Sequence, residues 1–399
     1  MAGRFHRFWQ VTAWLVLGLI AAAVVIWGLS LPPDPSRFYS ARSVPEQPGT
    51  LVRAEGFTRK VPDGARGWRI LYSTSRGGGR PVLASALVLA PKAKSDAPRR
   101  VIAWAHGTTG IVAGCAPSMM PDPFQHTPAL REAIAQGWVI VATDYIGLGA
   151  EGVHPYLIGE GEARSVLDAV RAARHIEGLS LADETVVWGH SQGGHAALWT
   201  GLLAPRLAPD VRILGVAALA PATDLPALLR QAQHSTAGRL VSSYIVSAYS
   251  ATYPDVSFDG VVREEAARLV HDVARRCMSG PRALVTAAEV SMFETPIFQF
   301  DDPAQGGAFG DRLRQNTPQG PLPVPVWIAQ GGQDKLVLPH IQDVYVQRQC
   351  EAGQVLSYGQ YADRDHLSLV AADSPAAKDL VAWTVQRFNA APAANDCRR

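Results

Sequence analysis

The sequence places a serine between glycines in a setting suited to nucleophilic chemistry, Gly189-His190-Ser191-Gln192-Gly193. The apolar run 185–188 comes directly before this motif, and a helical pattern of small residues, 193–198, follows it. A G-x-S-x-G motif between a strand and a helix forms a sharp turn that projects the serine hydroxyl, and its glycines avoid Cβ clashes. The helix N-terminus behind the turn favours developing negative charge. We therefore predict that Ser191 is a nucleophile.

A serine nucleophile needs a base, because its hydroxyl is un-ionised at neutral pH. Asp334 follows the apolar run 326–329, and His366 follows the run 355–358. Folds with this serine turn deliver nucleophile, acid and histidine in that chain order, with the last two on loops after later strands. We therefore expect Asp334 to orient His366 towards Ser191.

Other residues of the chain could serve as the acid or the histidine. The alternatives are Asp343 and Asp363 for the acid, and His340 for the histidine. His190 adjoins the nucleophile, but a neighbour in such a turn points away from it, so a packing role is expected. His106 and His195 are likewise expected to be structural.

The segment Ala105-His106-Gly107-Thr108-Thr109-Gly110 follows the apolar run 101–105. A loop in this place supplies one backbone N–H to an oxyanion hole, and the residue after the nucleophile supplies the other. We predict Thr108 for the first donor, with Thr109 as the alternative, and Gln192 for the second.

The segment 147–152, Gly-Leu-Gly-Ala-Glu-Gly, matches a dinucleotide-binding pattern. His154-Pro155-Tyr156 follows where that pattern requires a helix, and the preceding strand is not the first of the sheet. Dinucleotide binding is therefore rejected, and no cofactor is expected. The histidines lack metal-ligand spacing, so no metal is expected either.

Continuous apolar runs alternate with helical patterns along the body of the chain. The predicted strands cover 68–73, 81–89, 101–105, 138–142, 185–188, 214–219, 326–329 and 355–358. The predicted helices between and after them cover 128–136, 161–176, 194–203 and 374–388. Continuous rather than alternating runs are typical of parallel strands covered on both faces. The pattern predicts an α/β fold with a mostly parallel, doubly wound sheet.

A helical interval interrupts this alternation between Leu225 and Pro323. Since a structureless loop of this length is rare in a compact domain, we expect an inserted helical cap at 226–322, flanked by core segments 32–225 and 323–390 and a tail at 391–399. Its part 301–320 is expected to be mobile. Leu240, Tyr244, Ile245 and Tyr249 recur at helical spacing and either shelter an acyl chain or pack against the core.

The N-terminus carries an uncharged apolar block, 11–29, within the predicted segment 1–31. It is long enough to span a bilayer, and Arg4 and Arg7 before it favour a cytoplasmic N-terminus. Both a cleaved signal peptide and an uncleaved membrane anchor remain open. Either places the body outside the cytoplasm, on the periplasmic or extracellular side.

Composition excludes several classes of protein. With 18% charged residues and a net charge of +2 over 399 residues, nothing global indicates a nucleic-acid partner. Four cysteines are too few for a disulfide-dense miniprotein, but an exported body allows two bridges among three possible connectivities. The oligomeric state is not indicated.

Together the motifs resemble the secretory lipase family of bacterial and fungal α/β-hydrolases, the yeast lipase A type. The matching segments are 106–110 with Cys-Ala-Pro-Ser at 115–118, 143–149 with His-Pro-Tyr at 154–156, 189–194, 218–224 and 330–334. The resemblance covers about residues 45–390. It departs at the N-terminal block and at His190, where fungal members often have tyrosine.

The resemblance implies an α/β-hydrolase fold in which the cap is a lid, with Ser191, Asp334 and His366 as the triad. It also implies the disulfides Cys115–Cys277 and Cys350–Cys397.

We accordingly expect a lipase or carboxylesterase that cleaves small-molecule or lipid esters through an acyl-enzyme, with a role in lipid catabolism. The membrane is a partner only if the N-terminal segment is uncleaved. The alternatives are an acyltransferase or serine peptidase with the same triad, or a non-catalytic binding module.

Overall fold

The computed structural model describes residues 9–10, 12–18, 20–21, 28 and 31–398, except for 234, 279–280 and 293–294. The strands of the described chain are β1 (Leu51–Phe57), β2 (Ala65–Ser75), β3 (Pro81–Pro91), β4 (Arg99–Ala105), β5 (Val139–Ile146), β6 (Leu181–His190), β7 (Arg212–Leu219), β8 (Val326–Gly331) and β9 (Leu356–Tyr361). The labelled helices are α2 (Leu130–Ala135), α3 (Gly159–Ala173), α4 (Gln192–Leu207), α5 (Leu225–Ala232), α6 (Thr236–Thr252), α7 (Phe258–Val261), α8 (Glu264–Ala274), α9 (Pro281–Ser291), α10 (Ala308–Gln315), α11 (Pro339–Glu351) and α12 (Pro375–Phe388).

The strands form one mixed sheet in the order β1-β2-β3-β5-β4-β6-β7-β8-β9. Strands β1, β2, β3 and β5 pair antiparallel, whereas the pairs from β5 through β4 to β9 are parallel. The predicted mostly parallel sheet is confirmed for this second part. Because parallel strands all point the same way, their carboxyl ends, and the loops that follow them, meet at one edge.

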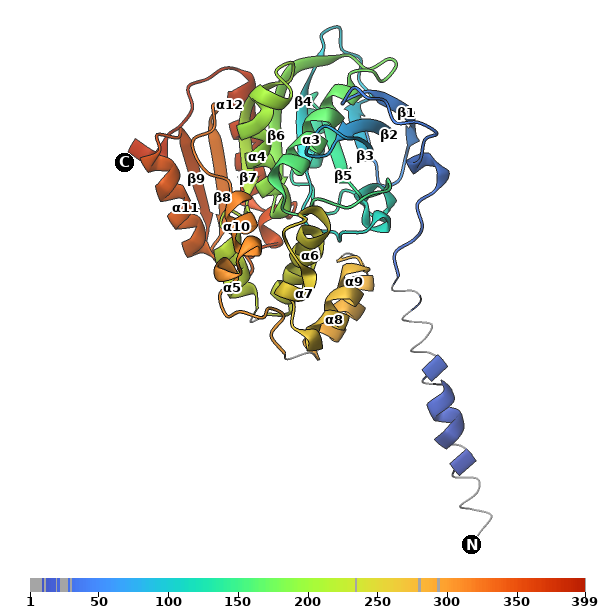
Figure 1. The fold of residues 1–399 in the computed structure, drawn as a ribbon. Helices are drawn as coiled ribbons and strands as arrows, with labels where there is room; N and C mark the ends of the chain where they lie inside the picture. The colour runs from blue at the N-terminus through green and yellow to red at the C-terminus, as the bar shows by residue number, and fades with distance from the viewer. Residues whose placement is uncertain are drawn as a thin grey trace.

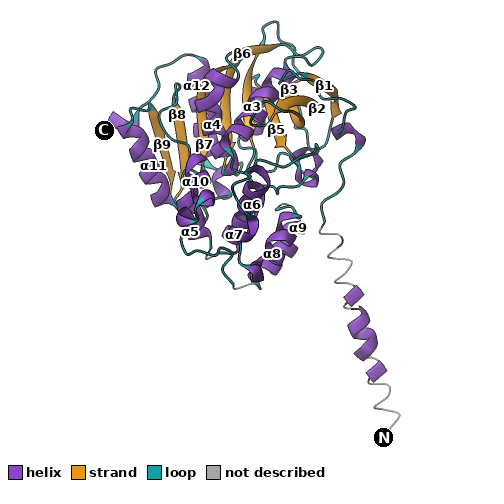
Figure 2. Ribbon diagram, viewed as in Figure 1, coloured by secondary structure: helices purple, strands orange, loops and turns teal. Residues whose placement is uncertain are grey.

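Helices cover both faces of the sheet, which explains the continuous apolar runs (Figure 2). On β6 the neighbouring residues Val186 and Val187 enter opposite cores, as the two-residue period of a strand requires. Helices α3, α4 and α11 contribute to the core that contains Val187, and α2 and α12 contribute to the core that contains Val186.

The chain between β7 and β8 forms α5 to α10, over the interval for which the sequence predicts a cap, 226–322, and we refer to it as the cap. In Figure 1 its helices α6, α7, α8 and α9 lie together beyond the carboxyl ends of the parallel strands. The cap has an apolar core of its own, in which Leu240, Tyr244, Ile245 and Tyr249 are buried. Of the two roles expected for these four side chains, the structure shows packing, within the apolar core of the cap.

Three elements differ from the predicted ones. The segment 301–320, expected as a mobile loop, contains α10, whose Phe309 and Leu313 are buried in the cap core. Strand β1 was not predicted, because most of its side chains are exposed and it has no apolar run. Helix α11 was also not predicted, because only Gln342, Tyr345 and Gln349 of its residues are buried.

About half of the positions of the apolar N-terminal block, 11–29, lie outside the described residues. Of the positions that are described, 12–18 are helical and exposed. Among the described residues, no helix combines the length and the hydropathy needed to cross a bilayer. The choice between signal peptide and anchor stays a prediction.

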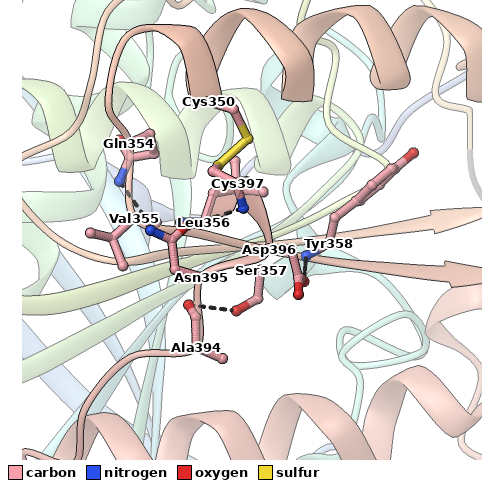
Figure 3. Close-up of a disulfide and its surroundings, with 10 residues drawn as sticks. All are labelled: Cys350, Gln354, Val355, Leu356, Ser357, Tyr358, Ala394, Asn395, Asp396 and Cys397. Atoms are coloured by element: carbon pink, nitrogen blue, oxygen red, sulfur yellow. Dashed lines mark hydrogen bonds between the residues drawn. A yellow bond between two sulfur atoms is a disulfide. The ribbon is translucent and has the colours of Figure 1, made fainter. Parts of the chain in front are cut away.

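The C-terminal tail runs along the outer side of β9, the last strand of the sheet (Figure 3). The Tyr358 N–H donates to Asp396 Oδ2 at 2.9 Å, and the Ser357 hydroxyl donates to the Ala394 carbonyl at 3.0 Å. The disulfide Cys350–Cys397 joins this tail to α11. The pairing implied by the resemblance is thus present here, and so is Cys115–Cys277.

Candidate active site

The predicted serine turn joins β6 to α4. Ser191 lies between them with φ 57° and ψ −119°, a left-handed backbone conformation that is strained for a residue with a side chain. A Cβ on Gly189 would lie 1.9 Å from the Gly193 carbonyl oxygen, and a Cβ on Gly193 would lie 1.9 Å from the Ala105 carbonyl oxygen. The motif glycines are therefore sterically required for this turn.

The structure brings Ser191, His366 and Asp334 together in one chain of hydrogen bonds. His366 Nε2 lies 2.8 Å from Ser191 Oγ, and His366 Nδ1 lies 2.7 Å from Asp334 Oδ2. The other carboxylate oxygen of Asp334 accepts the backbone N–H groups of Leu336 and Val337 at 2.8 and 2.9 Å. These bonds hold the buried carboxylate in position, so the imidazole can accept the serine proton.

The alternative residues lie elsewhere. Asp343 is on α11, where its Oδ1 accepts the Tyr358 hydroxyl at 2.9 Å and the Gln360 amide at 3.1 Å. His340 is exposed on the same helix, and Asp363 is exposed in the loop after β9. The carboxylate hydrogen-bonded to His366 is that of Asp334.

Both predicted oxyanion residues adjoin the nucleophile. Gln192 is the first residue of α4, where an N–H has no acceptor within the helix. Thr108 lines the same pocket as Ser191, and a Cβ on the adjacent Gly107 would lie 3.6 Å from the Ser191 Cβ. The carbonyl of Thr109, the alternative, accepts the Met278 N–H at 2.8 Å.

The segment 147–152, rejected as a dinucleotide motif, and the His-Pro-Tyr piece that follows it have a different place in the site. Gly147 turns the chain so tightly that a Cβ there would lie 2.4 Å from the His154 nitrogen. His154 Nε2 then lies 3.0 Å from the side-chain nitrogen of Gln192, and the Tyr156 hydroxyl lies 2.6 Å from Thr108 Oγ1. One loop therefore contacts both predicted oxyanion residues.

Protonation states in this loop follow from burial. Burial lowers the pKa of His154 to about 3, and its Nδ1 donates to the Ile146 carbonyl at 3.0 Å. Neutral His154 can thus accept at Nε2 from the Gln192 amide. Burial also raises the pKa of Tyr156 above its ordinary range, so its hydroxyl keeps its proton. The sequence signal for these contacts is the His-Pro-Tyr piece, which argues against dinucleotide binding and belongs to the resemblance but by itself assigns no role to His154 or Tyr156.

The prediction that His190 points away from the site is wrong. Its ring lies 4.8 Å from the His366 ring, centroid to centroid, and it lines the pocket that contains Ser191. Burial, with the nearby His366 charge as a smaller cause, holds the pKa of His190 well below its usual value. Neutral His190 donates through Nε2 to the His366 carbonyl at 2.9 Å. The side chain can turn inwards because Gly107 leaves space beside it.

A second histidine–carboxylate pair lies beneath the serine turn. His195 Nδ1 lies 2.7 Å from Glu162 Oε2, and both side chains are fully buried. His195 Nε2 lies 2.7 Å from the Asn316 carbonyl oxygen, at the end of α10. Glu162 Oε1 also accepts from the Gln192 side chain at 2.9 Å. The expected structural role of His195 agrees with this setting. His106 is also buried, which lowers its pKa to about 4.

The base of the cap is joined directly to the site. The disulfide Cys115–Cys277 connects the loop after β4 to the segment after α8. The next residue, Met278, lines the pocket of Ser191 together with Val241 of α6. Among the described residues, no group of three or more histidine, cysteine, aspartate or glutamate side chains is arranged to hold a metal ion.

Comparisons with known proteins find similarity between this chain and several lipases. A family model described as secretory lipase matches residues 126–396. A protein named probable inactive lipase from Mycobacterium tuberculosis is 24% identical over 385 residues, which cover 90% of this chain and 82% of that protein. Lipase A of Arthroderma benhamiae is 23% identical over 401 residues, covering 92% and 82%. The X-ray structure of Candida antarctica lipase A matches with a TM-score of 0.70 at 18% identity, covering 92% and 89%.

Proposed function

The chain belongs to the secretory lipase family and has an α/β-hydrolase fold, and from this premise we propose that Ser191, His366 and Asp334 hydrolyse acyl esters through an acyl-enzyme. Its enzyme class is that of the carboxylic ester hydrolases. The observation that carries the proposed mechanism is the continuous hydrogen-bond chain from Ser191 Oγ through the His366 ring to Asp334.

In the first half-reaction, His366 Nε2 takes the proton of Ser191 as Oγ attacks the ester carbonyl carbon. The tetrahedral intermediate then collapses: the bond to the alcohol oxygen breaks, and His366 returns the proton to the departing alcohol. In the second half-reaction, His366 removes a proton from water, the resulting hydroxide attacks the acyl-enzyme, and the Ser191 hydroxyl is restored as the acid leaves. Asp334 stabilises the imidazolium in both halves.

The oxyanion of each intermediate is stabilised by the backbone N–H groups of Thr108 and Gln192. The location of Gln192 at the start of α4 supports this assignment, because the positive end of the helix dipole adjoins the developing charge. Tyr156 and His154 hold the side chains of these two residues, and His190 holds the backbone of His366. All three act as positioning residues.

The insertion 226–322 acts as the lid over a catalytic core formed by 32–225 and 323–390. Its location beyond the carboxyl ends of the parallel strands (Figure 1) supports this role, because Ser191, Asp334 and His366 follow the carboxyl ends of β6, β8 and β9. The substrates are lipid esters, with a role in lipid catabolism, in keeping with the family. Export by the N-terminal segment is consistent with two disulfides, which persist in oxidising compartments.

The test is a Ser191→Ala variant assayed on a chromogenic acetyl ester, with Ser40→Ala as the matched control at an exposed site. We expect hydrolysis by wild type and the control but almost none by Ser191→Ala. A fluorophosphonate should add one phosphonyl group to Ser191, detected by peptide mass, and none in the variant. Equal hydrolysis by all three proteins would refute the mechanism.

A second candidate is a non-catalytic binding protein, and one observation favours it: a relative carries the name probable inactive lipase. The same experiment separates the two functions, because a binding protein gives neither Ser191-dependent turnover nor an adduct. Transfer of the acyl group to an added alcohol in preference to water would instead indicate an acyltransferase, and cleavage of peptides in preference to esters a peptidase.

A further inference from the structure

The pocket that contains Ser191 is small. Its volume is about 170 Å³, and its lining includes Val241 and Met278 from the cap side and Leu336 from the loop after β8. Pockets for drug-sized ligands have roughly 300–1,000 Å³. A volume below this range suits a short acyl group better than a long acyl chain.

The Met278 wall is tied to the catalytic core at several points. The disulfide Cys115–Cys277 ends one residue before it, and the Met278 N–H donates to the Thr109 carbonyl at 2.8 Å. The Tyr244 hydroxyl of α6 donates to the Arg276 carbonyl at 2.9 Å. Met278 therefore cannot move away from the loop 105–110, which carries Thr108, without breaking the hydrogen bond to Thr109 and straining the disulfide. We call this loop the oxyanion loop.

The Val241 wall is also fixed. Val241 is 4% exposed, on a helix whose Tyr249 hydroxyl donates to the Leu157 carbonyl at 2.9 Å. On the same helix, the fully buried ring of Tyr244 packs edge-on against the Tyr156 ring, with centroids 5.9 Å apart. Since the Tyr156 hydroxyl contacts Thr108, displacing α6 would also disturb the oxyanion loop.

In the acyl-enzyme, the acyl group is bonded to Ser191 Oγ, so it must lie in the space that begins at this atom. A chain that exceeds the pocket has either to displace Val241 or Met278, which the contacts above oppose, or to leave its surplus carbons outside the pocket, where they gain no burial. From these observations, and resting on the proposed function, we propose that the enzyme prefers esters of short acyl groups, with about two to six carbons. The fixed cap-side wall of Val241 and Met278 sets this limit.

The experiment measures kcat/KM on p-nitrophenyl esters from acetate to palmitate, with the full chain kept oxidised. We expect the largest value at two to six carbons and a fall of at least about tenfold by ten carbons. A maximum at twelve or more carbons would overturn the size limit while leaving Ser191-dependent hydrolysis intact. If no ester is hydrolysed in a Ser191-dependent way, the proposed function fails, and the size limit fails with it.

Two variants test the wall itself. Val241→Ala and Met278→Ala should each raise kcat/KM for eight- and ten-carbon esters relative to acetate by about fivefold or more. Val344→Ala makes the same chemical change as Val241→Ala at an exposed position of α11 and should leave the profile unchanged. If both wall variants keep the wild-type profile at an unchanged Tm, the assignment of the limit to this wall is overturned.

Discussion

The histidine–carboxylate pairs above and beneath the serine turn are alike in composition but not in their remaining contacts. In each pair a carboxylate oxygen lies 2.7 Å from Nδ1 of the histidine. His366 Nε2 faces the Ser191 hydroxyl, and its side chain is 13% exposed. His195 Nε2 faces the Asn316 carbonyl, and the whole pair is closed to solvent.

The group that faces Nε2 of the histidine, more than the histidine–carboxylate pair itself, therefore decides what each pair does. A hydroxyl can give its proton to Nε2, whereas a carbonyl oxygen only accepts and has no proton to give. The lower pair faces no hydroxyl that it could deprotonate, and it is closed to solvent. Its hydrogen bonds connect α3, α4 and the end of α10. We regard it as structural and the upper pair as the proposed catalytic one.

Substitution of the upper histidine should cause the largest change, a loss of catalytic activity that distinguishes the two pairs. His366→Ala should lower kcat by about 10⁴-fold or more, because the serine loses its base. The free energy of unfolding should change less than on disruption of the lower pair, since the His366 side chain is 13% exposed and Asp334 keeps the N–H groups of Leu336 and Val337. Steady-state kinetics and urea unfolding measure the two quantities. His340→Ala, at an exposed histidine, is the control, and retention of a tenth of the activity in His366→Ala would contradict the assignment.

The lower pair should show the opposite pattern. Glu162→Ala leaves His195 Nδ1 and the Gln192 amide buried without the carboxylate that they contact, and each buried polar group left unsatisfied costs about 1–3 kcal/mol of stability. Urea unfolding at neutral pH measures this loss. A change below about 1 kcal/mol would show that the pair does not hold these helices together.

Histidines that lack a carboxylate extend the comparison to pH. Burial lowers the pKa of His106 to about 4 and of His154 to about 3, so the unfolded state binds more protons than the folded state below pH 6.5. Their contribution to stability is complete above about pH 6.5 and is lost as the pH falls towards these values, by about 1.4 kcal/mol per pH unit for each histidine. His106→Asn should reduce the slope of unfolding free energy against pH between 6 and 4, and an unchanged slope would refute this origin.

The smallest effect concerns single hydroxyl groups. Tyr156→Phe removes the hydroxyl that contacts Thr108, and a loosened oxyanion loop should lower kcat about tenfold with little change in KM. The matched control is Tyr253→Phe, which removes the hydroxyl that accepts the Asn316 amide near the lower pair. It should leave kcat unchanged. Equal kcat in the two variants would indicate that Tyr156 has no positioning role.

The upper group could be predicted because each of its members has a local signal. Ser191 lies in a strand–turn–helix motif, and Asp334 and His366 each follow an apolar strand in the expected chain order. The lower pair has no such signal, because Glu162 and His195 are 33 positions apart on two helices and meet only when α3 and α4 pack together. Tyr156 and His190 were missed for the same reason, since their partners come from other loops.

The fold shows the same division between local and distant signals. Strands buried on both faces could be predicted, whereas β1 and α11 could not, because each lies at the surface with few buried residues. Helix α10 was missed because its Gly- and Gln-rich surroundings masked two buried anchors, Phe309 and Leu313.

The tail beside β9 has a consequence for the protein in concentrated solution. An edge strand whose N–H groups are free can pair with the same strand of another molecule. Here the Tyr358 N–H donates to Asp396 of the tail, and the Cys350–Cys397 disulfide holds the tail beside β9 (Figure 3). Reduction of that disulfide would free the tail and expose the edge of β9 to other molecules. We therefore expect the tail to protect this edge from aggregation only in an oxidising environment.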